Sequence, residues 1–193
     1  MKKIGIVIIA IVLIAGISGT FYMVNSNSQK KVQKEKTLTE IQKITSKDLD
    51  KNYPQTPREV VKLYNKILSC YYKENYTDKE LDGLVDQALK LFDDELAANN
   101  PKDTYKQSVQ DDAKNYSDQG ITMAQTDVCD SNDVKYITDN GKKIAYVRAS
   151  YFMKEGNSYS KTYQDYVLRQ DEKGCWKILT FYKVEAGADT EAE

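Results

Sequence analysis

The chain has 193 residues, a formal net charge of −1 and no histidine. The near-neutral charge, without a patch dense in lysine and arginine, argues against nucleic-acid binding. The missing histidine excludes Ser-His-Asp and Cys-His catalysis and removes the commonest zinc ligand. We expect neither a metal site nor a cofactor.

The first 24 residues predict a membrane anchor. Lys2 and Lys3 precede an uncharged apolar run from Ile4 to Val24, which is long enough to span a bilayer of about 30 Å as a helix. A cleavable signal peptide has the same basic start, so cleavage stays open, although the length favours an uncleaved signal anchor. Because long domains translocate largely regardless of flanking charge, we expect a single-pass protein of the cell membrane whose C-terminal domain is extracellular.

Two polar segments flank the expected folded domain of residues 53–185. Residues 25–52 are charged and poor in aromatic side chains, which is typical of a tether, and residues 186–193 form an acidic tail. Within the tether, three apolar residues have the spacing of one short helical stripe: Leu38, Ile41 and Ile44.

Capping motifs predict helices in the first half of the domain. Thr56, Pro57 and Glu59 form a capping box with proline at the first helical position, and a second box starts at Thr77. A further helical turn is expected before Pro101, and another helix is expected over residues 102–117. The apolar residues of the first helix share one face: Val60, Leu63, Tyr64, Ile67, Cys70 and Tyr71.

After Gly120 the apolar period changes to two, which is typical of strands. Asn140-Gly141 and Gly156-Asn157 predict two-residue hairpin turns, and Gly174 suits a left-handed bulge. The expected strands are residues 121–128 and 134–138, which form one interrupted strand, and then 142–153, 159–170 and 175–184.

These turns predict a register in which Leu168 lies opposite Ile178 and Tyr166 lies opposite Thr180. One face of the sheet, expected against the helices, then carries Val134, Tyr136, Ala145, Val147, Ala149, Tyr151, Met153, Tyr166, Leu168, Trp176, Ile178, Tyr182 and Val184.

The opposite face is too apolar for a wholly solvated surface. A cross-strand ion pair between Arg148 and Asp165 on a wet surface is one interpretation. The other is a dimer or partner interface made by Ile144, Arg148, Phe152, Asp165, Leu179 and Phe181.

Helices followed by a bent antiparallel meander that ends in "GCWKILTFYKV" resemble the NTF2-like superfamily. Gly174, Trp176, Lys177 and Ile178 match the Gly-x-Trp-Lys-Ile-like last strand of that family, and the likeness covers about residues 56–185. The chain looks closest to uncharacterised membrane-anchored members from Gram-positive bacteria. The resemblance implies an α+β cone of N-terminal helices on a curved antiparallel sheet, often with a pocket between the layers and frequently dimeric through the outer sheet face.

Some members of that superfamily are isomerases or dehydratases that use a pocket carboxylate as a base, whereas many others only bind. Here the helix-facing side of the sheet offers hydroxyl and amide groups but no carboxylate, so a non-catalytic domain that binds a small ligand or a protein partner is favoured. An enzyme whose base comes from a helix, such as Asp82 or Glu74, remains the alternative. A ligand in the cup would meet Tyr151, Gln164, Tyr166 and Thr180, with Trp176 as a wall; otherwise these side chains fill the core.

Overall fold

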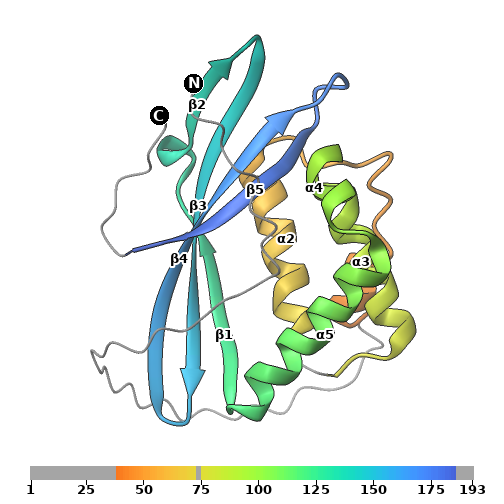
Figure 1. The fold of residues 1–193 in the computed structure, drawn as a ribbon, viewed down its shortest axis with the longest axis vertical. Coiled ribbons are helices and arrows are strands. Elements are labelled where there is room, and N and C mark those ends of the chain that lie inside the picture. The colour runs from red at the N-terminus through yellow and green to blue at the C-terminus, as the bar shows by residue number, and fades with distance from the viewer. Residues whose placement is uncertain (1–37, 73–74, 186–193) are drawn as a thin grey trace.

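The computed structural model describes residues 38–72 and 75–185. In this part the chain is α+β, with a helical layer packed on one face of a curved antiparallel sheet (Figure 1). The predicted anchor at residues 1–24 and the acidic tail at 186–193 lie outside the described residues. Within the described stretches, no helix combines the length and apolarity needed to cross a membrane.

The helices come first in the chain and the strands follow, so helices and strands do not alternate. In chain order they are α1 (Glu40–Thr45), α2 (Pro57–Tyr71), α3 (Asp78–Leu91), α4 (Asp94–Asn99), α5 (Lys102–Asp118), β1 (Ile121–Val128), the 3-10 turn η1 (Ser131–Asp133), β2 (Lys135–Asp139), β3 (Lys142–Glu155), β4 (Ser158–Gln170) and β5 (Trp176–Val184).

The long helices begin where the capping motifs predict. The Thr56 hydroxyl accepts a hydrogen bond from the Glu59 N–H, and the Glu59 carboxylate accepts one from the Thr56 N–H. Thr77 and Glu80 repeat this arrangement at the start of α3. Each box satisfies N–H groups that the first turn of a helix leaves unpaired. Cys70 lies on the buried face of α2, as predicted.

The folded domain begins well before residue 53. Thr39 and Gln42 form a capping box that starts α1. Ile44 and Leu49 are only 1% and 3% exposed and belong to the hydrophobic core. The prediction that residues 25–52 are all tether is therefore wrong from about Thr39 onward, because these two apolar side chains dock on the helical layer.

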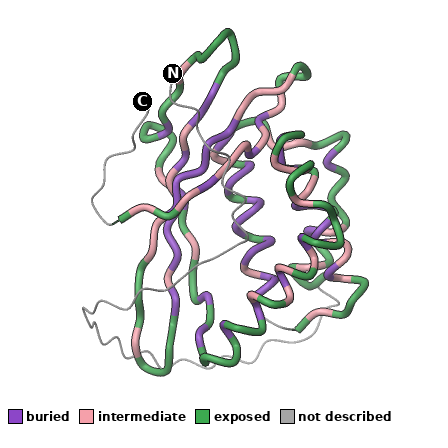
Figure 2. Tube along the Cα trace, viewed as in Figure 1, coloured by how far each residue is buried: buried purple, intermediate pink, exposed green. Residues whose placement is uncertain are grey.

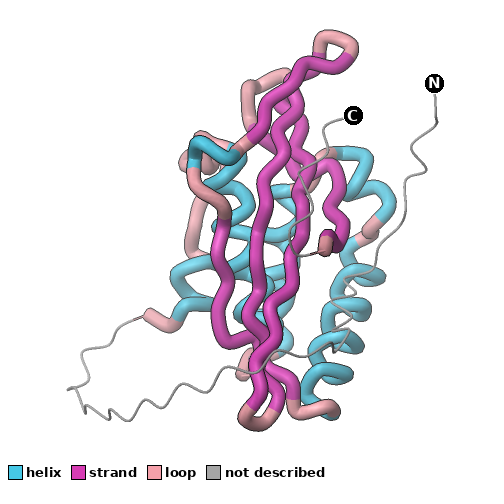
Figure 3. Tube along the Cα trace, turned by 90° about the vertical axis from the view of Figure 1, so that its left-hand side faces the viewer, coloured by secondary structure: helices cyan, strands magenta, loops and turns pink. Residues whose placement is uncertain are grey.

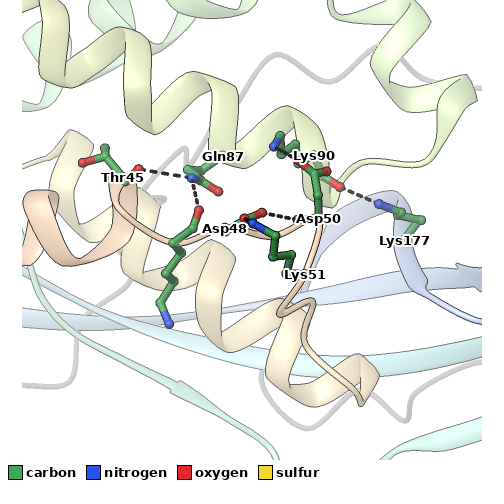
Figure 4. Close-up of polar contacts among 8 residues, drawn as sticks. Thr45, Asp48, Asp50, Lys51, Gln87, Lys90 and Lys177 are labelled. Atoms are coloured by element: carbon green, nitrogen blue, oxygen red, sulfur yellow. Dashed lines mark hydrogen bonds and ion pairs between the residues drawn. The ribbon is translucent and has the colours of Figure 1, made fainter.

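Polar contacts fasten this N-terminal segment to α3, and α3 in turn to β5 (Figure 4). The Gln87 side-chain amide donates to the backbone carbonyl of Lys47 at 2.9 Å, and the Lys90 ammonium lies 2.7 Å from the Asp50 carboxylate. The Lys177 ammonium donates to the Lys90 carbonyl at 2.7 Å. The chain therefore enters the folded domain on its helical side.

The sheet has the strand order β1-β3-β4-β5, and β2 pairs with β3 next to β1. β1 pairs with the second half of β3 and β2 with its first half, so the predicted interrupted strand is confirmed. Asn140 and Gly141 have φ values of 48° and 79° at the β2–β3 turn, the left-handed conformations that a type I′ turn requires. Gly174 also has positive φ, at 82°.

The predicted register is confirmed as far as the pair Leu168–Ile178 and is wrong beyond it. Leu179 is an extra residue in a bulge, which shifts every later residue of β5 to the opposite face. Phe181 consequently points into the core and is 6% exposed, while Thr180 lies away from the helices. Tyr182 and Val184, which were predicted to face the helices, likewise lie away from them.

The two faces of the sheet have different surroundings. Figure 2 shows buried positions running along the middle of the strands and along α2, where the core lies. Figure 3 shows the face opposite the helices, which no described helix covers. We call the helix-facing side the inner face and the other side the outer face; by register, the outer face carries Ile144, Tyr146, Arg148, Phe152, Tyr163, Asp165, Val167, Thr180 and Tyr182.

Candidate binding surfaces

Tyrosine side chains fill the interior between α2, α5 and the inner face. The Tyr151 hydroxyl donates to Asn65 Oδ1 at 2.8 Å and contacts the Tyr166 hydroxyl, which donates to Gln164 Oε1 at 3.1 Å. Next to them the Tyr64 and Tyr105 hydroxyls are 3.2 Å apart. Five tyrosines in this interior are at most 3% exposed: Tyr64, Tyr71, Tyr105, Tyr151 and Tyr166.

Three residues predicted to bind a ligand therefore belong to the core. Tyr151 and Tyr166 are 0% exposed and Gln164 is 5% exposed, and their polar atoms bond to one another. Burial raises the pKa of both tyrosines far above the ordinary value, so they remain protonated hydroxyls at neutral pH. Of the other two predicted residues, Thr180 lies on the outer face, and only Trp176 borders an open recess.

The carboxylates considered as a catalytic base do not enter this interior. Asp82 forms a surface ion pair with Lys106 at 2.8 Å, and Glu74 lies outside the described residues. A different carboxylate is half-buried: Asp112 on α5 accepts a hydrogen bond from the Tyr72 hydroxyl, and desolvation raises its pKa to about 6. The helical spacing of Asp112 from the inward-facing Tyr105 and Tyr116 is the sequence signal that marks it.

A charged pair lies at the centre of the outer face. Arg148 contacts Asp165 through two parallel hydrogen bonds, Nε to Oδ1 at 2.7 Å and Nη2 to Oδ2 at 2.8 Å. The predicted cross-strand alignment of the two residues is confirmed. The Asp165 side chain is 1% exposed and that of Arg148 is 22% exposed, so the pair is shielded, unlike the wet surface pair that was one of the two interpretations.

Aromatic side chains surround this ion pair. The Lys161 ammonium lies 4.9 Å from the ring centroid of Phe152 and 5.0 Å from that of Tyr163. Ile144 and Val167 are each 8% exposed although they face away from the helices. Leu179 is half-buried in the β5 bulge. The structure thus keeps five of the six predicted interface residues at or near this surface and removes Phe181 to the core.

The β2–β3 hairpin extends beyond the helical layer (Figure 1), and its side chains line a recess together with Trp176. The recess has a volume of about 370 Å³. The Tyr136 ring packs edge-on against Trp176, with centroids 5.7 Å apart. Tyr136 was predicted to face the helices, but it is 57% exposed because the helices end before this row of the sheet. Five residues line the recess: Tyr136, Ile137, Thr138, Lys143 and Trp176.

The chain matches the family described as "Domain of unknown function (DUF6715)" over residues 1–181. The matched region takes in the predicted anchor and ends within β5. No curated protein matches the chain.

Proposed function

The chain belongs to the DUF6715 family, whose function is unknown, and on that premise we propose a membrane-tethered, extracytoplasmic interaction domain without catalytic activity. Residues 4–24 would anchor it in the cytoplasmic membrane, and the helices and sheet would form an NTF2-like cone. The observation that carries the proposal is the contrast between a tyrosine-filled interior and an outer face with half-buried aromatic side chains around the ion pair of Arg148 and Asp165.

The filled interior argues against the isomerase- or dehydratase-like alternative. Such an enzyme needs a base within hydrogen-bonding reach of a bound substrate. In the described part of the chain, the hydrogen-bond partners of Tyr151 and Tyr166 are hydroxyl and amide oxygens, and none of them is a carboxylate. Asp112 has the raised pKa of a suitable base, but its partner is the Tyr72 hydroxyl rather than any group of this interior.

The partner that fits the outer face is a second copy of this chain. Tyrosine and arginine are enriched in the energetically dominant parts of interfaces. The face also carries both signs of charge, with Asp127 on β1 and Lys161 on β4. A two-fold interface brings the same patch of both subunits together, so a patch with both signs can complement itself.

Anchoring favours self-association of this kind. Two copies held in one membrane meet at a much higher effective concentration than free copies do. Because α1 packs against the helices α2 and α3, the chain enters each domain on the side opposite the outer face. A dimer through the outer faces would leave both tethers on its outside, free to reach the membrane.

Sedimentation equilibrium of residues 38–193 tests this proposal. We expect a dimer in the micromolar range, and we expect Phe152→Glu to make it monomeric by placing a charge in the contact. Tyr136→Glu is the matched control, because Tyr136 is an exposed aromatic residue on the inner-face side of β2, and it should leave the dimer intact. A wild-type monomer would overturn the dimer, and a search for a different membrane-protein partner of the outer face would follow.

A further inference from the structure

The recess beside Trp176 brings together an exposed aromatic ring, a hydroxyl and an ammonium group. Side chains from three strands line it: Tyr136, Ile137 and Thr138 of β2, Lys143 of β3 and Trp176 of β5. Its volume of about 370 Å³ falls within the range of roughly 300–1,000 Å³ that is usual for small-ligand pockets.

The aromatic wall of the recess is held in place before any ligand arrives. The Tyr53 hydroxyl donates to the Trp176 backbone carbonyl at 2.9 Å, and the Lys177 ammonium lies 4.2 Å from the Tyr53 ring centroid. Trp176 is itself 7% exposed, so it supports the exposed ring of Tyr136 from behind. Side chains that are already ordered lose little conformational entropy on binding.

Charge adds a second feature to this aromatic platform. Lys143 lies next to it, and within the described residues its ammonium group makes no ion pair. Thr138, its cross-strand partner, supplies a hydroxyl that both donates and accepts hydrogen bonds. A complementary ligand therefore combines a flat apolar face, hydroxyl groups and a negative charge.

We propose that this recess binds a saccharide that carries a carboxylate. The C–H face of a pyranose ring would stack on Tyr136, its hydroxyls would bond to Thr138, and its carboxylate would pair with the ammonium group of Lys143. An acidic peptide is the alternative ligand, because among the described strands β2 pairs with β3 alone and leaves its other edge open. A peptide added along that edge would bond to the β2 backbone, whereas a saccharide would use the side chains of Trp176 and Lys143 on the other two strands.

Trp176 allows the proposal to be tested on the full chain, because it is the only tryptophan in the sequence. The probe is glucuronosyl-glucose, a disaccharide with one carboxylate, titrated against the intrinsic tryptophan fluorescence of the protein in a zwitterionic detergent. A glycoside detergent would compete with the probe. Cellobiose, which has the same size without the charge, and a tripeptide of glutamate are titrated in parallel.

We expect saturable binding of the acidic disaccharide and at least tenfold weaker binding of cellobiose. Tyr136→Ala should abolish the response to both sugars, whereas Tyr159→Ala should not change it. Lys143→Gln should remove the preference for the acidic sugar, and Lys142→Gln, its neighbour on the same strand, should retain it.

Three results would overturn this proposal. The first is that no saccharide changes the tryptophan fluorescence. The second is that the glutamate tripeptide binds as tightly as the acidic disaccharide. The third is that the fluorescence response to the sugars persists in Tyr136→Ala. The sedimentation of Phe152→Glu is independent of these titrations, because it concerns the outer face, so the dimer and the saccharide site can fail separately.

Discussion

The inner and outer faces of the sheet use the same residue type for opposite purposes. Tyr151 and Tyr166 are fully buried, with hydroxyls that bond to Asn65 and Gln164. Tyr163, also on β4, stays half-exposed under the Lys161 ammonium group. Because successive side chains of a strand point to opposite faces, a tyrosine-rich sequence can build both a sealed interior and a contact surface from the same two strands.

The largest expected effect separates these two faces on one strand. Tyr166→Ala should destabilise residues 38–193 by about 3–5 kcal/mol, as removal of a large buried aromatic side chain does. Tyr163→Ala should cost the isolated monomer less than about 1 kcal/mol. Urea unfolding, followed by circular dichroism at a concentration where the chain is monomeric, measures both. Equal losses for the two variants would mean that the outer face is packed as tightly as the inner one.

The ion pair of the outer face should show the next largest effect. Arg148→Met leaves the Asp165 carboxylate buried without its partner, and such a loss costs about 3–5 kcal/mol. The double variant Arg148→Met/Asp165→Leu should recover most of this stability, because no charge is then left buried. If Arg148→Met alone had no effect in urea unfolding, Asp165 would have to be reached by water, contrary to its 1% exposure.

The helices and turns of this fold were predictable because each has a local chemical signal. The boxes at Thr56 and Thr77 place α2 and α3, and Asn140-Gly141 places the β2–β3 turn. The N-terminal segment also has a local helix signal, the capping box of Thr39 and Gln42, but that signal does not show where Ile44 and Leu49 dock. Their burial depends on contacts with α2 and α3, which only the folded chain supplies.

The end of β5 was not predictable for a different reason. The predicted register kept Lys183 off the inner face, because burial of lysine is costly. In the structure Lys183 pairs with Gln164 on that face and is nevertheless exposed, since the strand has already passed beyond the helices. The bulge at Leu179 that allows this has no glycine to mark it, so Phe181 was assigned to the wrong face.

Asp112 provides a pH-dependent test of the helical layer. Its folded pKa of about 6 is above the ordinary value of 3.8, so the folded state binds this proton more tightly than the unfolded state does. The stabilisation is complete below about pH 4 and is lost as the pH rises through 6. Because Asp112 is half-exposed, we expect a loss on the order of 1 kcal/mol.

Urea unfolding of wild type and Asp112→Asn between pH 4 and pH 7 measures this dependence. The difference between their free energies of unfolding removes the contribution of the other titrating groups, because both proteins share them. The amide still accepts a hydrogen bond from Tyr72 and does not titrate, so the variant should lack the loss. Parallel curves for the two proteins would show that the pKa of Asp112 is not raised in the folded state.

The smallest expected effect concerns the cation on the outer face. Lys161→Ala removes an ammonium group that lies about 5 Å from the rings of both Phe152 and Tyr163, and cation–π contacts at exposed sites contribute about 0.5–1 kcal/mol. Lys154→Ala, whose ammonium is 5.9 Å from the Tyr159 ring centroid, is the matched control and should cost less. A larger loss in the control would show that Lys161 makes no such contact in solution.

The division between a sealed inner face and an associating outer face can be followed with fluorine NMR of residues 38–193 labelled with 3-fluorotyrosine. Assignment by single Tyr→Phe substitutions identifies the resonances of Tyr163 and Tyr166. On dilution from dimer to monomer the Tyr163 resonance should shift, and the Tyr166 resonance should stay in place and resist broadening by a soluble paramagnetic agent. A Tyr163 resonance that ignores dilution, or a Tyr166 resonance that the agent broadens, would contradict that division.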